Sequence, residues 1–422
     1  MSVFTIFCHG TGGASTKGVE KSEIVNLFSS SVAGINGSHY RSVPTPDSDW
    51  SKTGVKHSTG RGDSRADFIT LEGVGGAGDP RTKSFDANTG DWMVGANGGS
   101  SVFASATGKG VDINVVNAVN YVIWKLRNNH RPTAINMMGW SRGAVECIRI
   151  AHALHHDTAT SNIPVNIFAI DPVAGAGHNS EIDAINVHAN VRTLVSVISL
   201  GENRRAFAPM VEESFLTLHD KATQYVPLHM PGVHDTIAKY NNSAGKLSFN
   251  LCYRFLQQCG TSMGATDMFA MSDANCLQNY GLLLAGRGGT FGMHGKTLSD
   301  AEKGVKKGQG FFKSLFTGLG RTSRELDISP YVSSKKIFFN VHHEALFATQ
   351  CPATYAAHFG ASRGANGASI AREMISLGGS IGVSAAEAHK AALADLVPMQ
   401  PVSPAFIRRK VYLRNLSLVE RM

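Results

Sequence analysis

The sequence lacks the features that mark several classes of protein. Its six cysteines include no Cys-x-x-Cys pair, which argues against a zinc finger and against a disulfide-stapled secreted fold. No apolar run is long enough to span a membrane, and the first ten residues carry no basic leader, so we expect neither a transmembrane helix nor a cleaved signal peptide. No basic run is interleaved with aromatic side chains as in a nucleic-acid platform, so nucleic acid is not an expected partner.

Charged residues are also few, at 17%, whereas hydrophobic residues make up 42% of the 422-residue chain. A disordered chain shows the opposite balance, so we expect a large packed domain with insertions. The 45 glycines indicate many tight turns. The net charge of +8 favours an acidic partner surface such as anionic lipid, or serves only solubility.

Strand and helix patterns alternate through the first half of the chain, which is typical of an α/β fold with a mostly parallel sheet flanked by helices. Short apolar runs predict strands at 3–8, 134–138, 165–170, 194–200 and 224–228. Helical spacing predicts helices at 23–32, 112–128 and 145–154. Residues 1–245 form the predicted core, with 53–110 as a long glycine-rich insertion, and residues 246–422 are C-terminal additions.

The motif Gly-x-Ser-x-Gly, which marks the nucleophile elbow of α/β-hydrolases, occurs around four serines: Ser141, Ser262, Ser362 and Ser380. The elbow needs a strand before the serine and a helix after it. Only Ser141 has both, because an apolar run leads into Gly139 and a helical pattern follows Gly143. The sequence therefore predicts an α/β-hydrolase-like fold with Ser141 as the nucleophile.

A serine nucleophile needs a histidine base and a carboxylate that orients it. Two acids follow predicted strands: Asp171 ends the first strand after the elbow helix, and Glu202 ends the next. Strand order alone favours Glu202, because many α/β-hydrolases carry their acid after that strand. For the base, His234 follows a further strand, and His342 with His343 are a rival pair. Position alone leaves both choices open.

The segment His9-Gly-Thr-Gly-Gly13 follows the first predicted strand and suits an oxyanion hole. The backbone N–H of Thr11 is the donor expected from this loop, and the N–H of Arg142, next to the nucleophile, is the second. A phosphate-binding loop is less well supported, because neither Gly-x-x-x-x-Gly-Lys-Ser/Thr nor Gly-x-Gly-x-x-Gly is present.

Several motifs occur in the order found in one bacterial and fungal α/β-hydrolase family. They are Gly139-Trp-Ser-Arg-Gly-Ala144, Gly73-Val-Gly-Gly76, Asp171-Pro-Val173, Glu202-Asn-Arg-Arg-Ala-Phe207 and Pro231-Gly-Val-His234. The first resembles the elbow Gly-Phe-Ser-Arg-Gly-Ala of a family that includes type VI secretion lipase effectors. The resemblance covers roughly residues 1–240, with proline at 172 where the family has threonine. It implies Asp171 as the acid and His234 as the base.

By this resemblance we expect a lipid carboxylester hydrolase, of the phospholipase A type, that works through an acyl-enzyme and acts as an antibacterial effector. Its expected partners are a phospholipid or other lipid ester, a membrane surface, a secretion machinery and a cognate immunity protein. Synthesis in the cytoplasm and contact-dependent delivery into a target cell would follow. The alternatives are a soluble esterase and a non-catalytic binding protein on a hydrolase scaffold. The mechanism requires no cofactor and no metal, although the acidic loop containing Asp63 and Asp86 is a candidate for calcium.

Segment 303–320 combines basic residues with an apolar stripe. Phe311, Leu315 and Leu319 fall four residues apart, and lysines flank them. This pattern is typical of a helix that lies in a lipid interface, or of a helix packed on the core by the same stripe. We therefore expect a lid or membrane-contacting segment here, with core packing as the alternative.

Overall fold

The computed structural model describes the chain in a set of ranges that covers most of the first 264 residues. These ranges are 3–13, 24–30, 32, 37–38, 57–74, 83–94, 110–175, 178–199, 202, 207–211, 215–230, 232–240, 242–264 and 279. The lid candidate 303–320, the rival bases His342 and His343, and the motif serines Ser362 and Ser380 all lie outside the described residues.

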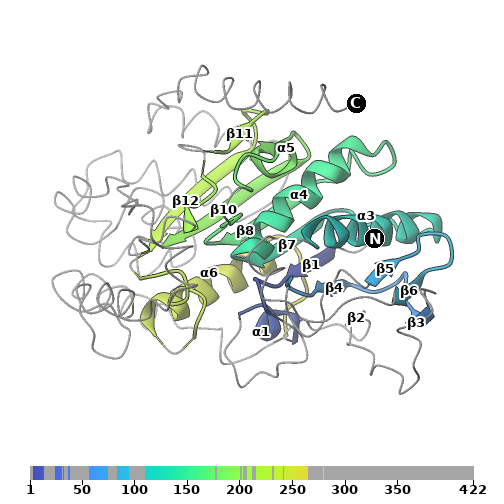
Figure 1. Cartoon of the computed structure of the whole chain (residues 1–422), viewed down its shortest axis with the longest axis horizontal. Coiled ribbons are helices and arrows are strands. Elements are labelled where there is room, and N and C mark those ends of the chain that lie inside the picture. Colours follow the sequence, from blue (N-terminus) through green and yellow to red (C-terminus); the bar gives the residue numbers. More distant parts are fainter. Residues whose placement is uncertain are drawn as a thin grey trace, which may run out of the picture.

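A seven-stranded sheet forms the centre of the described structure (Figure 1). Its strand order is β12 (Gln224–Met230), β10 (Val191–Ser199), β8 (Val165–Ile170), β7 (Ile135–Trp140), β1 (Phe4–Cys8), β4 (Phe68–Leu71) and β2 (Gly37–Ser38). Every pairing within it is parallel. The predicted α/β class with a mostly parallel sheet is therefore confirmed.

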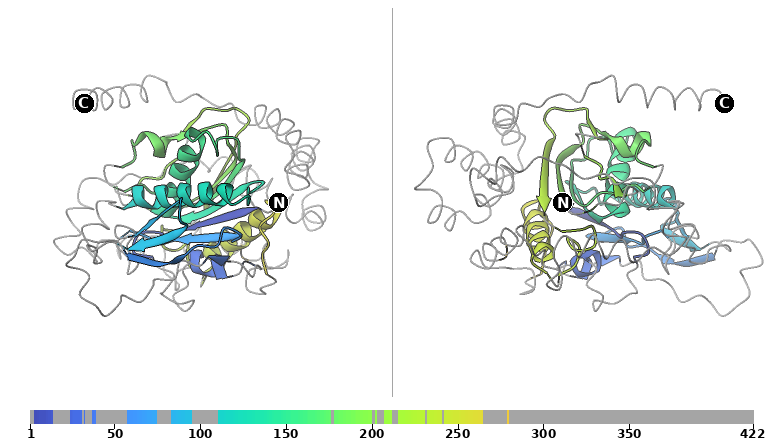
Figure 2. Two further views of the ribbon diagram at one scale, coloured as in Figure 1. Left: turned by 90° about the vertical axis from the view of Figure 1, so that its right-hand side faces the viewer. Right: turned by 60° about the vertical axis from the view of Figure 1, so that its left-hand side comes forward.

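Helices cover both faces of this sheet (Figure 2). On one face lie α3 (Val111–Arg127), α4 (Arg142–His156) and the short α5 (Ile182–Ile185); on the other lie α1 (Ile24–Ser30) and α6 (Ser243–Gln258). Successive side chains of each strand point to opposite faces of the sheet and so contribute to two cores. Met137 of β7 packs toward α3 and α4, and Met138 packs toward α1 and α6. Buried parallel strands of this kind read as continuous apolar runs, which is why the sequence located them.

The region 53–110 contains more structure than the loop that the sequence predicts. Its described parts include the main-sheet strand β4 and a separate antiparallel sheet of β3 (His57–Arg61), β6 (Asp91–Val94) and β5 (Lys83–Phe85). Four residues of β4 are too short a run to stand out among glycine, serine and aspartate. Pairing with β1 and complete burial hold this strand in place.

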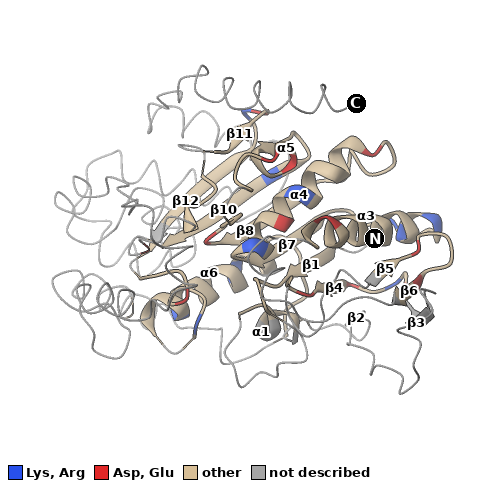
Figure 3. Cartoon of the chain, viewed as in Figure 1, with Lys and Arg blue, Asp and Glu red and all other residues tan. Residues whose placement is uncertain are grey.

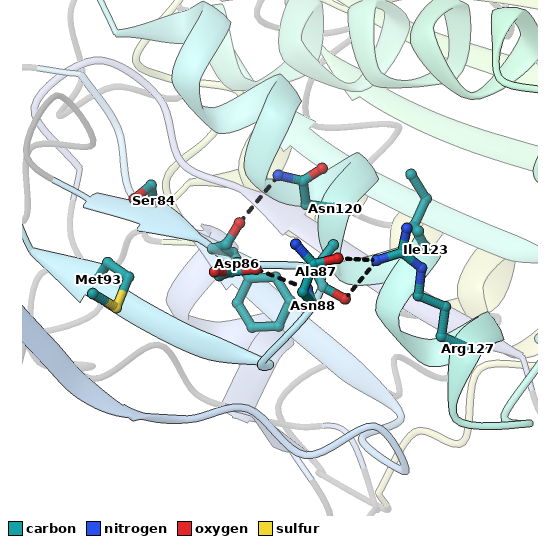
Figure 4. Close-up of a pocket in the computed structure, with 9 residues that line it drawn as sticks. Ser84, Asp86, Ala87, Asn88, Met93, Asn120, Ile123 and Arg127 are labelled. Atoms are coloured by element: carbon teal, nitrogen blue, oxygen red, sulfur yellow. Dashed lines mark hydrogen bonds between the residues drawn. The ribbon is translucent and has the colours of Figure 1, made fainter.

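The small sheet packs beside α3, and a cavity of about 540 Å³ lies between them (Figure 4). Two side chains of α3 close one side, because Asn120 donates to the Phe85 carbonyl at 3.1 Å and Arg127 donates to Asn88 Oδ1 at 2.7 Å. Two carboxylates of the candidate calcium loop accept hydrogen bonds from nearby backbone groups. Asp63 accepts from the Arg65 N–H, and Asp86 accepts from the Asn88 N–H.

At the other end of the core, α6 begins at Ser243 and ends at Gln258, so a boundary at residue 245 would divide this helix. A buried polar network then ties the following turn to the sheet. Asn136 of β7 donates to the Cys259 carbonyl at 3.0 Å and to Thr261 Oγ1 at 2.9 Å. The packed core thus continues at least to Thr261. Nowhere in the described ranges is there a helix with the length and apolarity needed to cross a membrane.

Acidic and basic side chains are interspersed along the described helices and strands (Figure 3). An example is Arg149 on α4, which contacts Asp183 at 2.6 Å and Glu181 at 3.4 Å. The described elements therefore carry mixed charge.

Candidate functional site

Ser141 occupies the turn between β7 and α4 in a strained conformation. Its φ is 58° and its ψ is −123°, a combination that a non-glycine residue adopts only when the surrounding structure imposes it. Hydrogen bonds of both its N–H and its carbonyl hold Ser141 in this conformation. Its N–H donates to the Ile170 carbonyl at 2.8 Å, and its carbonyl accepts from the Val173 N–H at 3.2 Å. These bonds tie the turn to the end of β8.

The two motif glycines allow the helix to approach the sheet at this turn. A Cβ at Gly139 would lie 2.4 Å from the carbonyl oxygen of Gly143, and a Cβ at Gly143 would lie 2.3 Å from that of Cys8. Both separations are far below van der Waals contact with backbone atoms that cannot move independently. Glycine at both positions is therefore a steric requirement of the elbow.

Three side chains form a continuous hydrogen-bonded chain at this point. The Nε2 atom of His234 lies 2.8 Å from Ser141 Oγ, and its Nδ1 atom lies 2.7 Å from Asp171 Oδ2. All three residues are buried, and Asp171 is completely inaccessible. Because a carboxylate accepts at Nδ1, the proton of the neutral ring resides there, which leaves Nε2 to accept from the serine hydroxyl.

The sheet topology explains how residues so far apart in sequence meet. Ser141 follows β7, Asp171 follows β8, and His234 lies in the loop after β12. These strands are parallel members of one sheet, so their carboxyl ends share an edge. This edge is where ligands bind in open α/β sheets.

The two acids that the sequence left open have different positions. Asp171 contacts the ring of His234, whereas Glu202 Oε2 accepts from the backbone N–H of His234 at 3.2 Å. Glu202 is also buried. It holds the main chain of the loop while Asp171 holds the imidazole.

Ser199, the last residue of β10, is a contact that the sequence analysis missed. Its N–H donates to Asp171 Oδ1 and its hydroxyl to Asp171 Oδ2, both at 2.9 Å. Together with the contact to His234, these bonds from described residues fix the orientation of the carboxylate. The available signal was the position of a serine at the end of the strand next to that of Asp171.

Aromatic rings surround the imidazole. Trp140 stacks on His234 with ring centroids 5.4 Å apart, and Phe207 meets it edge-on at 4.8 Å. Packing against two rings limits rotation of the imidazole and gives this side of the site an apolar surface.

The loop at residues 9–13 is clamped in place at the end of β1. The Gly12 N–H donates to the Val74 carbonyl and the Gly73 N–H to the Gly13 carbonyl, both at 2.9 Å. A Cβ at Gly73 would lie 1.8 Å from the Gly10 carbonyl oxygen, so the loop and the turn at 73–74 are in backbone contact. Since β1 pairs with β7, this positions Thr11 and Arg142 at the ends of adjacent strands.

The Arg142 side chain packs inside the protein rather than in solvent. It is buried, and its Nε donates to the Ala174 carbonyl at 3.3 Å. Burial lowers the pKa of Arg142, while Glu146 and Glu181 act in the opposite direction. The guanidinium thus braces the 171–175 turn, which leaves the backbone N–H of Arg142 as the group of interest for an oxyanion hole.

Of the rival motif serines, Ser262 is described and has different surroundings from Ser141. It is exposed and follows α6, so a helix rather than a strand precedes it. The elbow geometry that the motif requires is absent at that position.

Comparison with known proteins gives few matches. No protein-family model matches the chain, and no curated protein matches it. Among solved structures, a Tle1 effector bound to the VgrG spike of the Type 6 secretion system is 14% identical, with a TM-score of 0.30, over 58% of this chain and 52% of that one. An uncharacterized protein from Pseudomonas aeruginosa is 13% identical, with a TM-score of 0.33, over 99% of this chain and 62% of that one. The chain therefore spans less than two thirds of the length of either structure.

Proposed function

We propose that the protein is a serine hydrolase with an α/β-hydrolase core and that it cleaves carboxylesters of lipids. The observation that carries the proposal is the chain from Ser141 through His234 to Asp171, with Ser141 strained at φ 58°. An isolated hydrogen-bonded serine is common in proteins. A strained serine between a strand and a helix, bonded to a histidine that an acid orients, has the arrangement of an activated nucleophile.

In the reaction, Ser141 Oγ attacks the ester carbonyl carbon while His234 Nε2 takes its proton. Asp171 keeps the other ring proton on Nδ1 and stabilises the imidazolium that forms. The N–H groups of Thr11 and Arg142 donate to the oxyanion of the tetrahedral intermediate. His234 then returns its proton to the leaving alcohol as the acyl-enzyme forms. Water, activated by the same histidine, releases the fatty acid and regenerates Ser141.

The lipid substrate is supported by three features. They are the apolar rings of Trp140 and Phe207 beside His234, the resemblance of the elbow to that of lipase effectors, and the basic, apolar segment 303–320 in the sequence. A phospholipase A type of activity, delivery into a target cell by a secretion machinery and inhibition by an immunity protein in the producer follow from the same resemblance. The division into a hydrolase core and C-terminal additions also belongs to this proposal. The boundary expected at residue 245 falls within α6, so we place it after this helix.

The test compares two substrates. Purified protein should release fatty acid from phospholipid vesicles and should also cleave a short-chain soluble ester, whereas Ser141→Ala should do neither. Ser262→Ala is the matched control, since it alters an exposed serine in the same sequence motif, and it should retain both activities. Activity on the short ester alone would support the soluble esterase. A folded protein inactive on both substrates would support the non-catalytic binding protein.

A further inference from the structure

A cluster of histidines lies at the opposite end of α4 from Ser141. His155 and His156 occupy its last turn and His152 the turn before. His188 lies between β9 (Asn186–Val187) and β10, and His219 follows β11 (Thr217–Leu218). Ring centroids are 4.5 Å apart for His152 and His156, and 4.8 Å apart for His152 and His188. These five residues, here called the histidine cluster, form one contiguous group of imidazoles.

Three members of the cluster bring ring nitrogen atoms close together. Nitrogen atoms of His152, His156 and His188 all lie within 4.8 Å of one another, and His188 Nε2 is 3.1 Å from His152 Nδ1. Ligands of a tetrahedral zinc ion at about 2.0–2.1 Å are separated from each other by about 3.3 Å. The hydrogen-bonded pair of His188 and His152 has nearly this separation, and the proton that it shares would leave when both nitrogens bind the metal. His152 and His156 are four residues apart on one helix, so they share a face.

The ring of His188 is held in position by its neighbours. His155 stacks on it at 4.3 Å and His219 at 4.7 Å, both nearly parallel. His219 is itself fixed, because its Nε2 lies 2.7 Å from Asn186 Oδ1. A ligand whose ring plane is already restrained loses little conformational entropy on binding a metal.

The position on α4 also suits a cation, because the C-terminal end of a helix attracts positive charge and α4 ends at His156.

We propose that His152, His156 and His188 bind a divalent transition-metal ion of the zinc type, with water at the remaining position. Imidazole is a preferred ligand of such ions, and three histidines with one open position is an established zinc geometry. The ion would join the C-terminal part of α4 to the turn between β9 and β10.

This site is separate from the proposed nucleophile. At about 1.5 Å per residue, the 15 residues of α4 place its ends roughly 20 Å apart. We therefore expect the metal to stabilise the fold without taking part in chemistry at Ser141. The proposal can fail or succeed independently of hydrolysis.

Zinc binding by the untagged protein, stripped of metal with a chelator, tests the proposal. Zn²⁺ is titrated in competition with a chromophoric chelator into wild type, His156→Gln and His219→Gln. His156 is exposed, so its replacement should leave the fold intact. We expect one tight site per chain in wild type, weakened at least about 100-fold by His156→Gln, because even partners of metal ligands are worth 10–100-fold. His219→Gln, which removes a ring that stacks on His188 but is outside the ligand set, should weaken binding by about tenfold at most.

Two further readouts accompany the titration. Zn²⁺ should raise the melting temperature of wild type and of His219→Gln but not that of His156→Gln, since a ligand that binds only the folded state stabilises it. One equivalent of Co²⁺ should give wild type the visible absorption of a tetrahedral site. Wild-type affinity in His156→Gln, or no tight site in wild type, would overturn the proposal. Equal losses in His156→Gln and His219→Gln would overturn the three-histidine ligand set.

Discussion

Ser199 binds Asp171 twice: its N–H donates to Oδ1 and its hydroxyl to Oδ2, both at 2.9 Å. The backbone bond survives any substitution at 199, whereas the hydroxyl bond does not. Ser199→Ala should therefore reduce turnover without abolishing it, by roughly tenfold if the bond to the charged carboxylate contributes about 1.5 kcal/mol to its orientation.

Ser196→Ala is the control for this variant. Ser196 is buried on the same strand, and its hydroxyl has no hydrogen-bond partner within the described part of the chain. Turnover and its pH profile, measured on a soluble ester, should change only for Ser199→Ala. Equal effects of both substitutions would mean that β10 packing, and not the bond to Asp171, is responsible.

The two buried acids near His234 predict different consequences of amide substitution. Asp171→Asn should lower turnover by about 10⁴-fold, because the ring would lose the acceptor that fixes its tautomer and stabilises its cation. Glu202→Gln should have a small effect, because an amide oxygen can still accept from the backbone N–H of His234. Steady-state kinetics on one ester distinguish them, and a larger loss at Glu202 would contradict the assignment of Asp171 as the acid.

Substitution of the elbow glycine Gly143 by alanine should lower the stability of the fold. A Cβ there would lie 2.3 Å from the Cys8 carbonyl oxygen, so Gly143→Ala must push α4 away from β1. For comparison, Gly12 has φ +74° but open space around its Cβ position, so Gly12→Ala costs only about 1–2 kcal/mol of left-handed strain. Thermal denaturation should show the larger decrease for Gly143→Ala. A smaller decrease would show that the helix can move freely, against the steric account.

Burial of Glu146 should make the stability of the protein depend on pH. Burial raises the pKa of this α4 carboxyl to about 8, although Asn114, Arg149 and Arg142 favour its ionised form. Because the folded state holds the proton more tightly, stability from this group is present below pH 4.5 and is lost as the pH rises toward 8. Glu146→Gln removes this loss, so its melting temperature relative to wild type should rise between pH 5 and 8. A difference that is constant with pH would contradict the raised pKa.

The basic segment 303–320 gives a prediction that rests on the sequence. If the segment binds anionic lipid, replacing Lys306, Lys307 and Lys313 by Gln should weaken vesicle binding by about 1 kcal/mol per lysine, screened by salt. Vesicle hydrolysis should fall while hydrolysis of a soluble ester is unchanged. Equal losses on both substrates, together with a lower melting temperature, would instead favour a helix packed on the core.

The sequence predicted those features that depend on local pattern. The apolar runs that became β1, β7 and β8 were evident, as was the glycine spacing around Ser141, because buried parallel strands and a tight elbow each leave a local signature. It missed β4, whose four residues are held by distant partners. Position along the chain left the choice between Asp171 and Glu202 open for the same reason, and only the family resemblance favoured Asp171. The contact with the ring of His234 is a property of the fold.

The histidine cluster shows the same limit. The sequence displays His152, His155 and His156 together, but helical spacing alone does not indicate a metal site. The third converging residue, His188, is 36 residues from His152. The crossover from α4 through β8 and β9 brings them together, and no local pattern encodes that contact.

The most direct test of the central claim is labelling by a fluorophosphonate, which reacts with an activated serine whatever the natural substrate. Ser141 Oγ should attack the phosphorus and expel fluoride, so that mass spectrometry finds one phosphonyl group per chain, on the peptide containing Ser141. Labelling should be lost in His234→Ala and retained in Ser262→Ala. A folded protein that stays unlabelled, or is labelled at another serine, or is labelled equally well in His234→Ala, would contradict the account.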